Sequence, residues 1–209
     1  MKQILLIDLD RCFGCHACEV ACKQEKDLPV GPRPMQVVDL GSRRVLNTVC
    51  RDFVPIACFQ CESPNCVEIC PSGALLRNQK GIIQMNQDRC TGCALCLQAC
   101  PYGSINLNPS SEKAVKCDFC NHLIEKGLEP SCVSHCPANA LLLVEEKDFG
   151  KVGSRKYCAR FGQVAYFSHN WKILPFQSTG LSVAPSPTGS HNFDQNFSSE
   201  IAADTLRRD

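Results

Sequence analysis

The chain has 209 residues, 44% of them hydrophobic, and a formal net charge of +1 at pH 7. This length allows one compact domain or two small ones, and the balanced charge does not provide the basic surface that nucleic acid requires. Eighteen cysteines are far more than an intracellular enzyme normally carries, so most of them must be disulfides or metal ligands.

The sequence shows neither an export signal nor a membrane span. The apolar core near the N-terminus runs only from Ile4 to Ile7 before Asp8, which is too short for a secretory signal, and no twin-arginine leader precedes it. The apolar run over residues 138–144 is also too short for a transmembrane helix. We therefore expect a cytoplasmic protein, and in that reducing compartment many cysteines indicate metal rather than disulfides.

Sixteen of the eighteen cysteines form four quartets that vary one spacing. The first and third quartets are C-x2-C-x2-C-x3-C, the second has two extra residues between its second and third cysteines, and the fourth has a longer insertion at that point. In chain order the quartets are Cys12, Cys15, Cys18 and Cys22; Cys58, Cys61, Cys66 and Cys70; Cys90, Cys93, Cys96 and Cys100; and Cys117, Cys120, Cys132 and Cys136.

The third quartet, followed by Pro101, has the bacterial ferredoxin spacing, in which three cysteines ligate one cluster and the fourth ligates another. Three closely spaced thiolates wrap one cube, whereas the fourth begins the next helical segment and faces elsewhere. The quartets should therefore work in pairs, the second with the third and the first with the fourth. The predicted ligands are Cys12, Cys15, Cys18 and Cys136 for cluster A; Cys117, Cys120, Cys132 and Cys22 for cluster B; Cys58, Cys61, Cys66 and Cys100 for cluster C; and Cys90, Cys93, Cys96 and Cys70 for cluster D.

Short strands are expected on both sides of the quartets. Apolar residues lead into the first and third quartets at 4–9 and 81–85, and apolar stretches follow the other cluster loops at 73–76, 103–105 and 138–142. Residues 23–53 are an insertion between the first two quartets, and the alternation of apolar residues from Val37 to Val54 predicts a hairpin there.

The quartet pattern ends at about residue 146. Aromatic residues then concentrate in one stretch, and Pro, Ser, Gly and Asn dominate from Pro175 to Asn196, which is typical of an extended arm. A last short helix is predicted over Ser199 to Arg208. We expect residues 146–209 to form a C-terminal extension that binds a partner subunit or another copy of the chain through aromatic anchors. These aromatic residues are Tyr157, Phe161, Tyr166, Phe167, Trp171 and Phe176.

Together these patterns predict an α+β fold made of two interleaved ferredoxin-like modules, with short strands and helices and an extended C-terminal tail. Because cluster A joins Cys12 to Cys136, one module comprises residues 1–57 and 111–145, including the insertion. The other module comprises residues 58–110, with the second and third quartets.

The sequence resembles the four-cluster ferredoxin-like small subunits of molybdopterin and tungstopterin oxidoreductases, such as dimethyl sulfoxide reductase, polysulfide reductase and formate dehydrogenase. The likeness covers about the first 145 residues and includes the flanks of the quartets, among them Asp10-Arg11, Asp88-Arg89 and Lys116. It implies four [4Fe–4S] clusters, because every ligand position holds cysteine, and a non-catalytic electron-transfer subunit of anaerobic metabolism. The implied partner is a catalytic pterin subunit, with a flavoprotein subunit as a further candidate. The closer resemblance is to cytosolic relatives, among them the small subunits of tungsten aldehyde oxidoreductases and of benzoyl-coenzyme A reductase complexes.

Other interpretations of the cysteines remain open. A freestanding polyferredoxin, diffusing between enzymes, would carry the same clusters. Structural zinc is typical of two separated cysteine pairs, whereas C-x2-C-x2-C places three thiols in one loop. A substrate site is not indicated, because the radical-generating C-x3-C-x2-C run and the Gly-rich nucleotide-binding turns do not occur.

A few residues outside the ligand set carry weaker expectations. Cys50 and Cys158 lie outside the quartets and are expected to be small buried hydrophobic residues. His16 is expected either to donate a hydrogen bond to the first cluster or to face solvent. Lys116 and Arg89, beside ligands, either offset cluster charge or are solvated.

Overall fold

The N-terminal strand β1 (Gln3–Asp8) is an inner strand of a four-stranded sheet with the order β8-β1-β10-β9. The computed structural model describes residues 2–45, 48–151 and 157–169. Strand β8 (Leu141–Glu145) pairs with β1 in antiparallel register, with Ile4 opposite Val144. On the other edge, β10 (Val164–Ser168) runs parallel to β1, with Leu5 opposite Val164, and β9 (Tyr157–Phe161) completes the sheet.

Strand β1 has a continuous apolar sequence because both faces of this sheet are covered. Residues 4–7 are at most 2% exposed. Leu5 and Ile7 pack into the main core, which also contains Cys18, Cys22, Cys58, Cys117 and Cys132. Ile4 and Leu6 pack on the other face against Phe167 and the segment that carries the 3-10 helix η1 (Glu146–Lys151).

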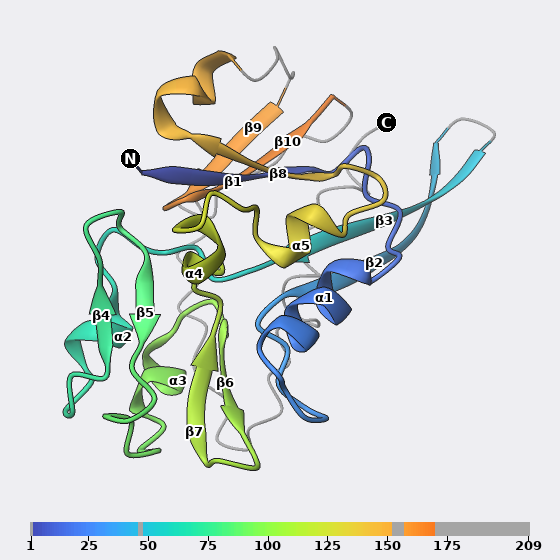
Figure 1. Cartoon of the computed structure of the whole chain (residues 1–209). Coiled ribbons are helices and arrows are strands. Elements are labelled where there is room, and N and C mark those ends of the chain that lie inside the picture. The colour runs from blue at the N-terminus through green and yellow to red at the C-terminus, as the bar shows by residue number, and fades with distance from the viewer. Residues whose placement is uncertain (1, 46–47, 152–156, 170–209) are drawn as a thin grey trace.

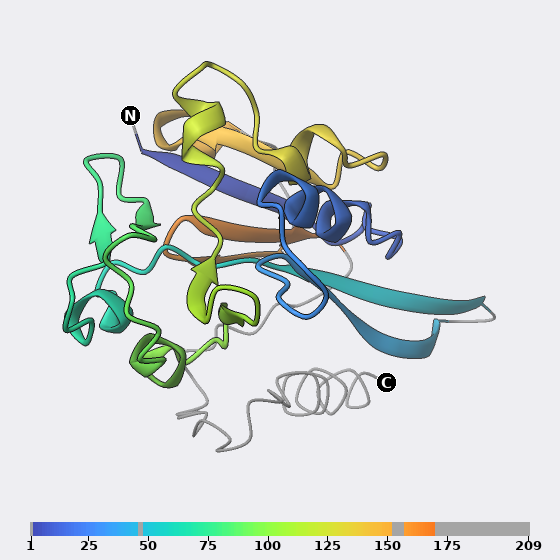
Figure 2. The same cartoon turned by 60° about the horizontal axis from the view of Figure 1, so that its bottom comes forward.

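Three antiparallel hairpins follow in the sequence, and they confirm the strands that were predicted beside the quartets. They are β2 (Gln36–Val45) with β3 (Thr48–Ile56), β4 (Leu75–Arg77) with β5 (Ile83–Met85), and β6 (Ile105–Asn108) with β7 (Lys113–Lys116). Figures 1 and 2 both show β2 and β3 reaching well beyond the rest of the described chain, whereas the two smaller hairpins lie side by side.

The helices are short, and four of the five carry the third cysteine of a quartet. They are α1 (Ala17–Glu25), α2 (Asn65–Glu68), α3 (Leu95–Ala99), α4 (Asn121–Ile124) and α5 (Ser131–Ser134). Helices α1 and α3 each follow a residue in the left-handed conformation, His16 with φ 60° and Ala94 with φ 59°. This turn separates the loop that holds the first two cysteines from the helix that holds the third.

A second, smaller core lies among β4 to β7 and helices α2 and α3. It contains Leu75, Ile83 and Ile105 together with cysteines of the second and third quartets. The fold is therefore an α+β arrangement of short helices and strands, as predicted. Within the described ranges, no helix combines the length and the apolar character that crossing a bilayer requires.

The structure corrects the expected start of the C-terminal arm. Strands β9 and β10 belong to the main sheet, and the predicted anchors Tyr166 and Phe167 are buried in the protein's own core. The run of aromatic residues here is core-forming because β10 is an inner strand, covered on both faces. Trp171, Phe176 and the helix predicted over 199–208 lie outside the described residues.

Candidate metal centres

The first of four groups of cysteines joins the N-terminal loop to the end of the fourth quartet. Burial, followed by the charges of Cys12, Glu19, Cys136 and Cys15, raises the pKa of the Cys18 thiol to about 12. The pKa of Cys12 is likewise raised by burial and by Cys136 and Cys15, against the lowering effect of the Gly14 amide. The four cysteines predicted for cluster A therefore lie close together; we call them group A.

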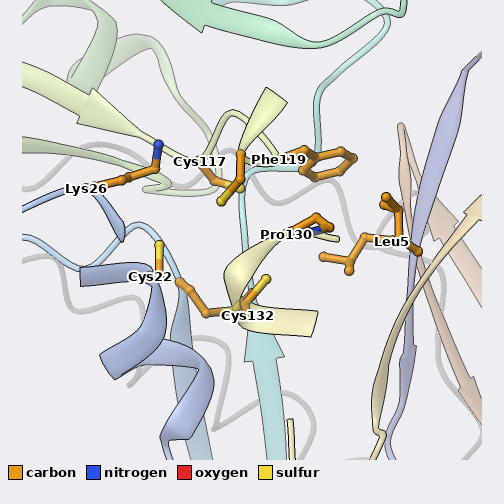
Figure 3. A pocket seen from close by; sticks show the side chains of 10 residues that line it. Leu5, Cys22, Lys26, Cys117, Phe119, Pro130 and Cys132 are labelled. Atoms are coloured by element: carbon orange, nitrogen blue, oxygen red, sulfur yellow. The ribbon is translucent and has the colours of Figure 1, made fainter. Parts of the chain in front are cut away.

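Group B surrounds a cavity between α1, α5 and the loop after β7. The cavity is lined by Cys22, Cys117, Cys120 and Cys132, the four cysteines predicted for cluster B, together with Leu5, Lys26, Met35, Phe119, Pro130 and Leu143. Figure 3 shows Cys117 on one side of this space, and Cys22 and Cys132 on the other. Burial raises the pKa of Cys22 to about 11, and it raises those of Cys117 and Cys132 strongly.

Groups C and D contain the cysteines of the second and third quartets. Group D lies in the smaller core, whereas group C lies between the two cores, with Cys58 and Cys61 in or against the main core and Cys66 and Cys100 in or against the smaller one. Burial raises the pKa of Cys61 to about 11, followed by the charges of Cys58, Cys100 and Cys66. These four cysteines are group C. Burial also raises the pKa of Cys96 to about 11. Its further causes are the charges of Cys70, Cys90, Cys66 and Cys93 in turn. Since the thiols that act on Cys66 are Cys58 and Cys100, we assign Cys66 to group C, and Cys70, Cys90, Cys93 and Cys96 to group D.

Backbone amides are directed at the sulfur atoms. The Ala140 amide donates to Sγ of Cys136 at 3.3 Å. Burial raises the pKa of Cys100 although the Ser104 and Tyr102 amides lower it. At Cys70 the balance is reversed, because hydrogen bonds from backbone amides and from the Ser72 side chain outweigh burial, and the pKa is lowered. Amide hydrogen bonds to cysteine sulfur are a general feature of iron–sulfur sites and help to set their potentials.

Each group fits a [4Fe–4S] cluster by the chemistry of its donors. Such a cluster needs four thiolates, shielding from water and hydrogen bonds to sulfur, and each group supplies four thiols. In every group at least one thiol has a pKa raised mainly by burial. Within the described ranges, no three His, Cys, Asp or Glu side chains converge tightly enough to hold a single metal ion.

The four groups follow one another in a row. The charge of Cys18 in group A contributes to the raised pKa of Cys132 in group B. In the same way, Cys58 of group C raises the pKa of Cys117 in group B, and Cys66 of group C raises the pKa of Cys96 in group D. The spatial order is therefore A, B, C, D. Of the sixteen thiols, only Cys15 in group A and Cys93 in group D are exposed.

Two side chains that the sequence analysis did not single out connect these loops. Gln60, which is 0% exposed, donates from Nε2 to the Cys117 carbonyl oxygen at 2.9 Å and accepts at Oε1 from the Ile83 amide at 2.8 Å. Lys26, which lines the cavity of group B, has its Nζ 2.6 Å from Oδ1 of Asp118. Burial lowers the pKa of Lys26, but the charge of Asp118 and the hydrogen bond to it raise the pKa by more, so that the pKa of Lys26 is raised.

The weaker expectations are resolved in different ways. His16 is exposed, with Nδ1 at 3.4 Å from a carboxylate oxygen of Glu19. Arg89 is exposed and Lys116 is buried. The prediction that Cys158 is buried is wrong, because it lies exposed on the edge strand β9, and Cys50 on the hairpin is only half-buried.

Comparison with known proteins agrees with this geometry. Residues 49–146 match the model of a 4Fe-4S dicluster domain, and residues 3–24 match that of a 4Fe-4S binding domain. The chain is 40% identical to a subunit of the tetrathionate reductase of Salmonella typhimurium over 70% of its own length and 59% of that protein's length. It is 41% identical to the thiosulfate reductase electron transfer subunit PhsB of Salmonella typhi, covering 67% of this chain and 74% of the relative. It is 37% identical to a subunit of the anaerobic dimethyl sulfoxide reductase of Escherichia coli, covering 70% and 72%.

Proposed function

The protein belongs to the family of [4Fe–4S] iron–sulfur subunits of tetrathionate, thiosulfate, polysulfide and dimethyl sulfoxide reductases, and we propose that it relays single electrons through four clusters to or from a catalytic subunit. The relatives are named as subunits of reductases, and one of them is named as an electron transfer subunit. This chain has the corresponding role in its complex, which is not a catalytic one. Groups A to D would hold the clusters, with the sixteen quartet cysteines as thiolate ligands.

One observation carries the proposal: the groups form a row whose two end members alone have exposed thiols. Cys15 lies at one end and Cys93 at the other, while the thiols of groups B and C are buried or half-buried. A relay needs shielded inner centres and accessible terminal ones, because electrons enter and leave at its ends. When bound, the clusters supply one-electron chemistry at potentials that charge, sulfur hydrogen bonds and exposure adjust.

The protein's own residues position and shield the thiolates. Helices α1 and α5 bring the first and fourth quartets together, and the smaller core brings the second and third together. Two interleaved ferredoxin-like modules, residues 1–57 with 111–145 and residues 58–110, account for this pairing. The hydrogen bond from Gln60 to the Cys117 carbonyl oxygen would then join the two modules where group B meets group C.

The partners are proposed from the family resemblance and from the two ends of the row. A catalytic molybdopterin or tungstopterin subunit is the partner that the family resemblance implies, and it would meet one end of the row. A second redox protein, of which a flavoprotein is one kind, would meet the other end. The cytoplasmic location and the self-association through the C-terminal residues remain predictions.

Anaerobic purification of the protein with its neighbouring subunits tests this function. We expect about sixteen irons per chain and four reducible [4Fe–4S] centres, in a stable complex with a larger enzyme. Cys15→Ser and Cys93→Ser should each remove one terminal cluster and stop electron transfer through the row, whereas Cys158→Ser should keep all four clusters. Iron-free protein would contradict the proposal, and a small brown protein that never binds a larger enzyme would favour the freestanding polyferredoxin.

A further inference from the structure

The side chain of Lys116 places an ammonium group inside the protein, between group B and group C. Lys116 ends strand β7 and is only 3% exposed. Its Nζ donates to the carbonyl oxygens of Ile83 at 2.6 Å and Cys117 at 2.5 Å. A charge removed from water is costly unless it is paired, so a lysine in this position requires an explanation.

The nearby carboxylate of Asp118 does not neutralise this lysine. Burial raises the pKa of Asp118, but Lys26 outweighs it through its charge and a hydrogen bond, and Lys116 adds only a later contribution. Asp118 is paired with Lys26 at 2.6 Å. Among the ion pairs of the described residues none includes Lys116, so its charge is held by two neutral carbonyl groups.

The ammonium group of Lys116 lies where group B meets group C. Its Nζ donates to the carbonyl oxygen of Cys117, a member of group B. The same carbonyl oxygen accepts from Gln60, which lies between Cys58 and Cys61 of group C. A buried cation at this junction will stabilise an electron added to either cluster, because reduction adds negative charge beside it.

We propose that Lys116 is a redox-tuning residue, which raises the potentials of clusters B and C. Reduction adds one negative charge to a core already surrounded by four thiolates. A buried cation opposes that charge with little screening by solvent or salt. We expect a smaller effect on the terminal clusters A and D, because Lys116 bonds at the junction of groups B and C. The inference rests on the proposed function and assigns a part in it to the one buried lysine among the described residues.

Reductive titrations of the full-length protein, followed by low-temperature electron paramagnetic resonance, test the proposal. Lys116→Gln removes the charge and keeps a hydrogen-bond donor, and Lys116→Arg keeps the charge. The matched control is Lys113→Gln, since Lys113 begins the same strand and donates to the Gln87 carbonyl oxygen at 2.7 Å in an exposed position. In Lys116→Gln we expect the equilibrium constant for reduction to fall about tenfold for two of the four clusters, which is about 59 mV for a one-electron couple. The other two clusters, and all four in Lys116→Arg and Lys113→Gln, should keep their potentials.

Several outcomes would overturn this proposal. Unchanged potentials in Lys116→Gln, an equal shift of all four clusters, or a shift to higher potential would each exclude specific tuning of B and C. Loss of iron from Lys116→Gln would assign the ammonium a structural role and would also overturn it. Failure of the proposed function is distinguishable, because the unsubstituted protein would then lack four reducible clusters before any variant is compared.

Discussion

The side-chain amide of Gln60 donates a hydrogen bond to the carbonyl oxygen of Cys117 across 2.9 Å, and so joins the cysteine loop of group C to that of group B. The two residues are 57 positions apart in the sequence. The same side chain accepts from the Ile83 amide, so one buried glutamine fixes three segments whose relative placement sets the distance between two redox centres.

Replacing Gln60 by leucine should loosen this junction. The Ile83 amide would lose its acceptor inside the protein, and an unsatisfied buried donor costs about 2 kcal/mol. Hydrogen exchange of the iron-loaded protein should show the protection of the Ile83 amide reduced by that amount. Gln98→Leu, at an exposed position on α3, is the control and should leave it unchanged. Equal protection in Gln60→Leu would show that the bond contributes nothing.

Tyr166 tests whether β10 belongs to the structural core. Its buried hydroxyl donates to the Pro55 carbonyl oxygen at 3.1 Å, and its ring packs edge-on against Phe59 and Phe161. We expect Tyr166→Phe to lower the free energy of unfolding by about 1 kcal/mol, and Tyr166→Ala by about 3–5 kcal/mol, measured anaerobically by thermal unfolding. Tyr102→Phe is the control, because no described residue bonds to that hydroxyl. A Tyr166→Ala protein of unchanged stability would mean that β10 is dispensable.

Gly162 provides a test of the turn between β9 and β10. Its φ is 54°, and an added Cβ would collide with the backbone carbonyl oxygen of Phe59, itself one residue from Gln60. We expect Gly162→Ala to destabilise the protein by at least about 2 kcal/mol, from left-handed strain together with the clash. At Gly150 an added Cβ would meet no described atom within 4 Å, so Gly150→Ala should change stability by less than about 0.5 kcal/mol. Thermal unfolding of the two variants side by side measures this difference. Equal stabilities of Gly162→Ala and Gly150→Ala would show that the turn is not constrained.

The exchange of cysteines between the first and fourth quartets predicts which thiols each substitution exposes. Cys136→Ala should release the cluster of the first quartet, because Cys136 lies in group A, and leave the fourth quartet's own three thiols protected. Cys22→Ala should do the reverse. Anaerobic alkylation followed by peptide mass spectrometry identifies the thiols that react. Labelling of Cys117, Cys120 and Cys132 in Cys136→Ala would contradict the assignment.

Much of the candidate site follows from local sequence, because a cluster loop is encoded by spacing. The strand over residues 4–9 and the hairpin from Val37 to Val54 could both be predicted in this way, whereas the division of the quartets into four ligand sets stays a prediction. Gln60 could not, since a glutamine between two cysteines resembles a solvated loop residue, and only the distant Ile83 and Cys117 satisfy it when buried.

The end of the described chain shows the same limit in another form. The aromatic run through Tyr166 and Phe167 shows no cysteine pattern, and its local antiparallel pairing with β9 does not show which sheet it joins. Its other partner is β1, reached by a parallel pairing across almost the whole described length. A local pattern reports that such a segment is apolar, but it does not report which surface that segment covers.

The pairing of β1 with β10 also bears on how the protein is made. Leu5 leaves the ribosome early, yet its neighbour Val164 is among the last described residues to be synthesised. The N-terminal strand must therefore wait, unpaired on one edge, while the intervening cysteines emerge as free thiols. Iron delivery to the first quartet, whose fourth thiol comes from Cys136, belongs late in biogenesis, and a nascent polypeptide needs protection from oxygen until then.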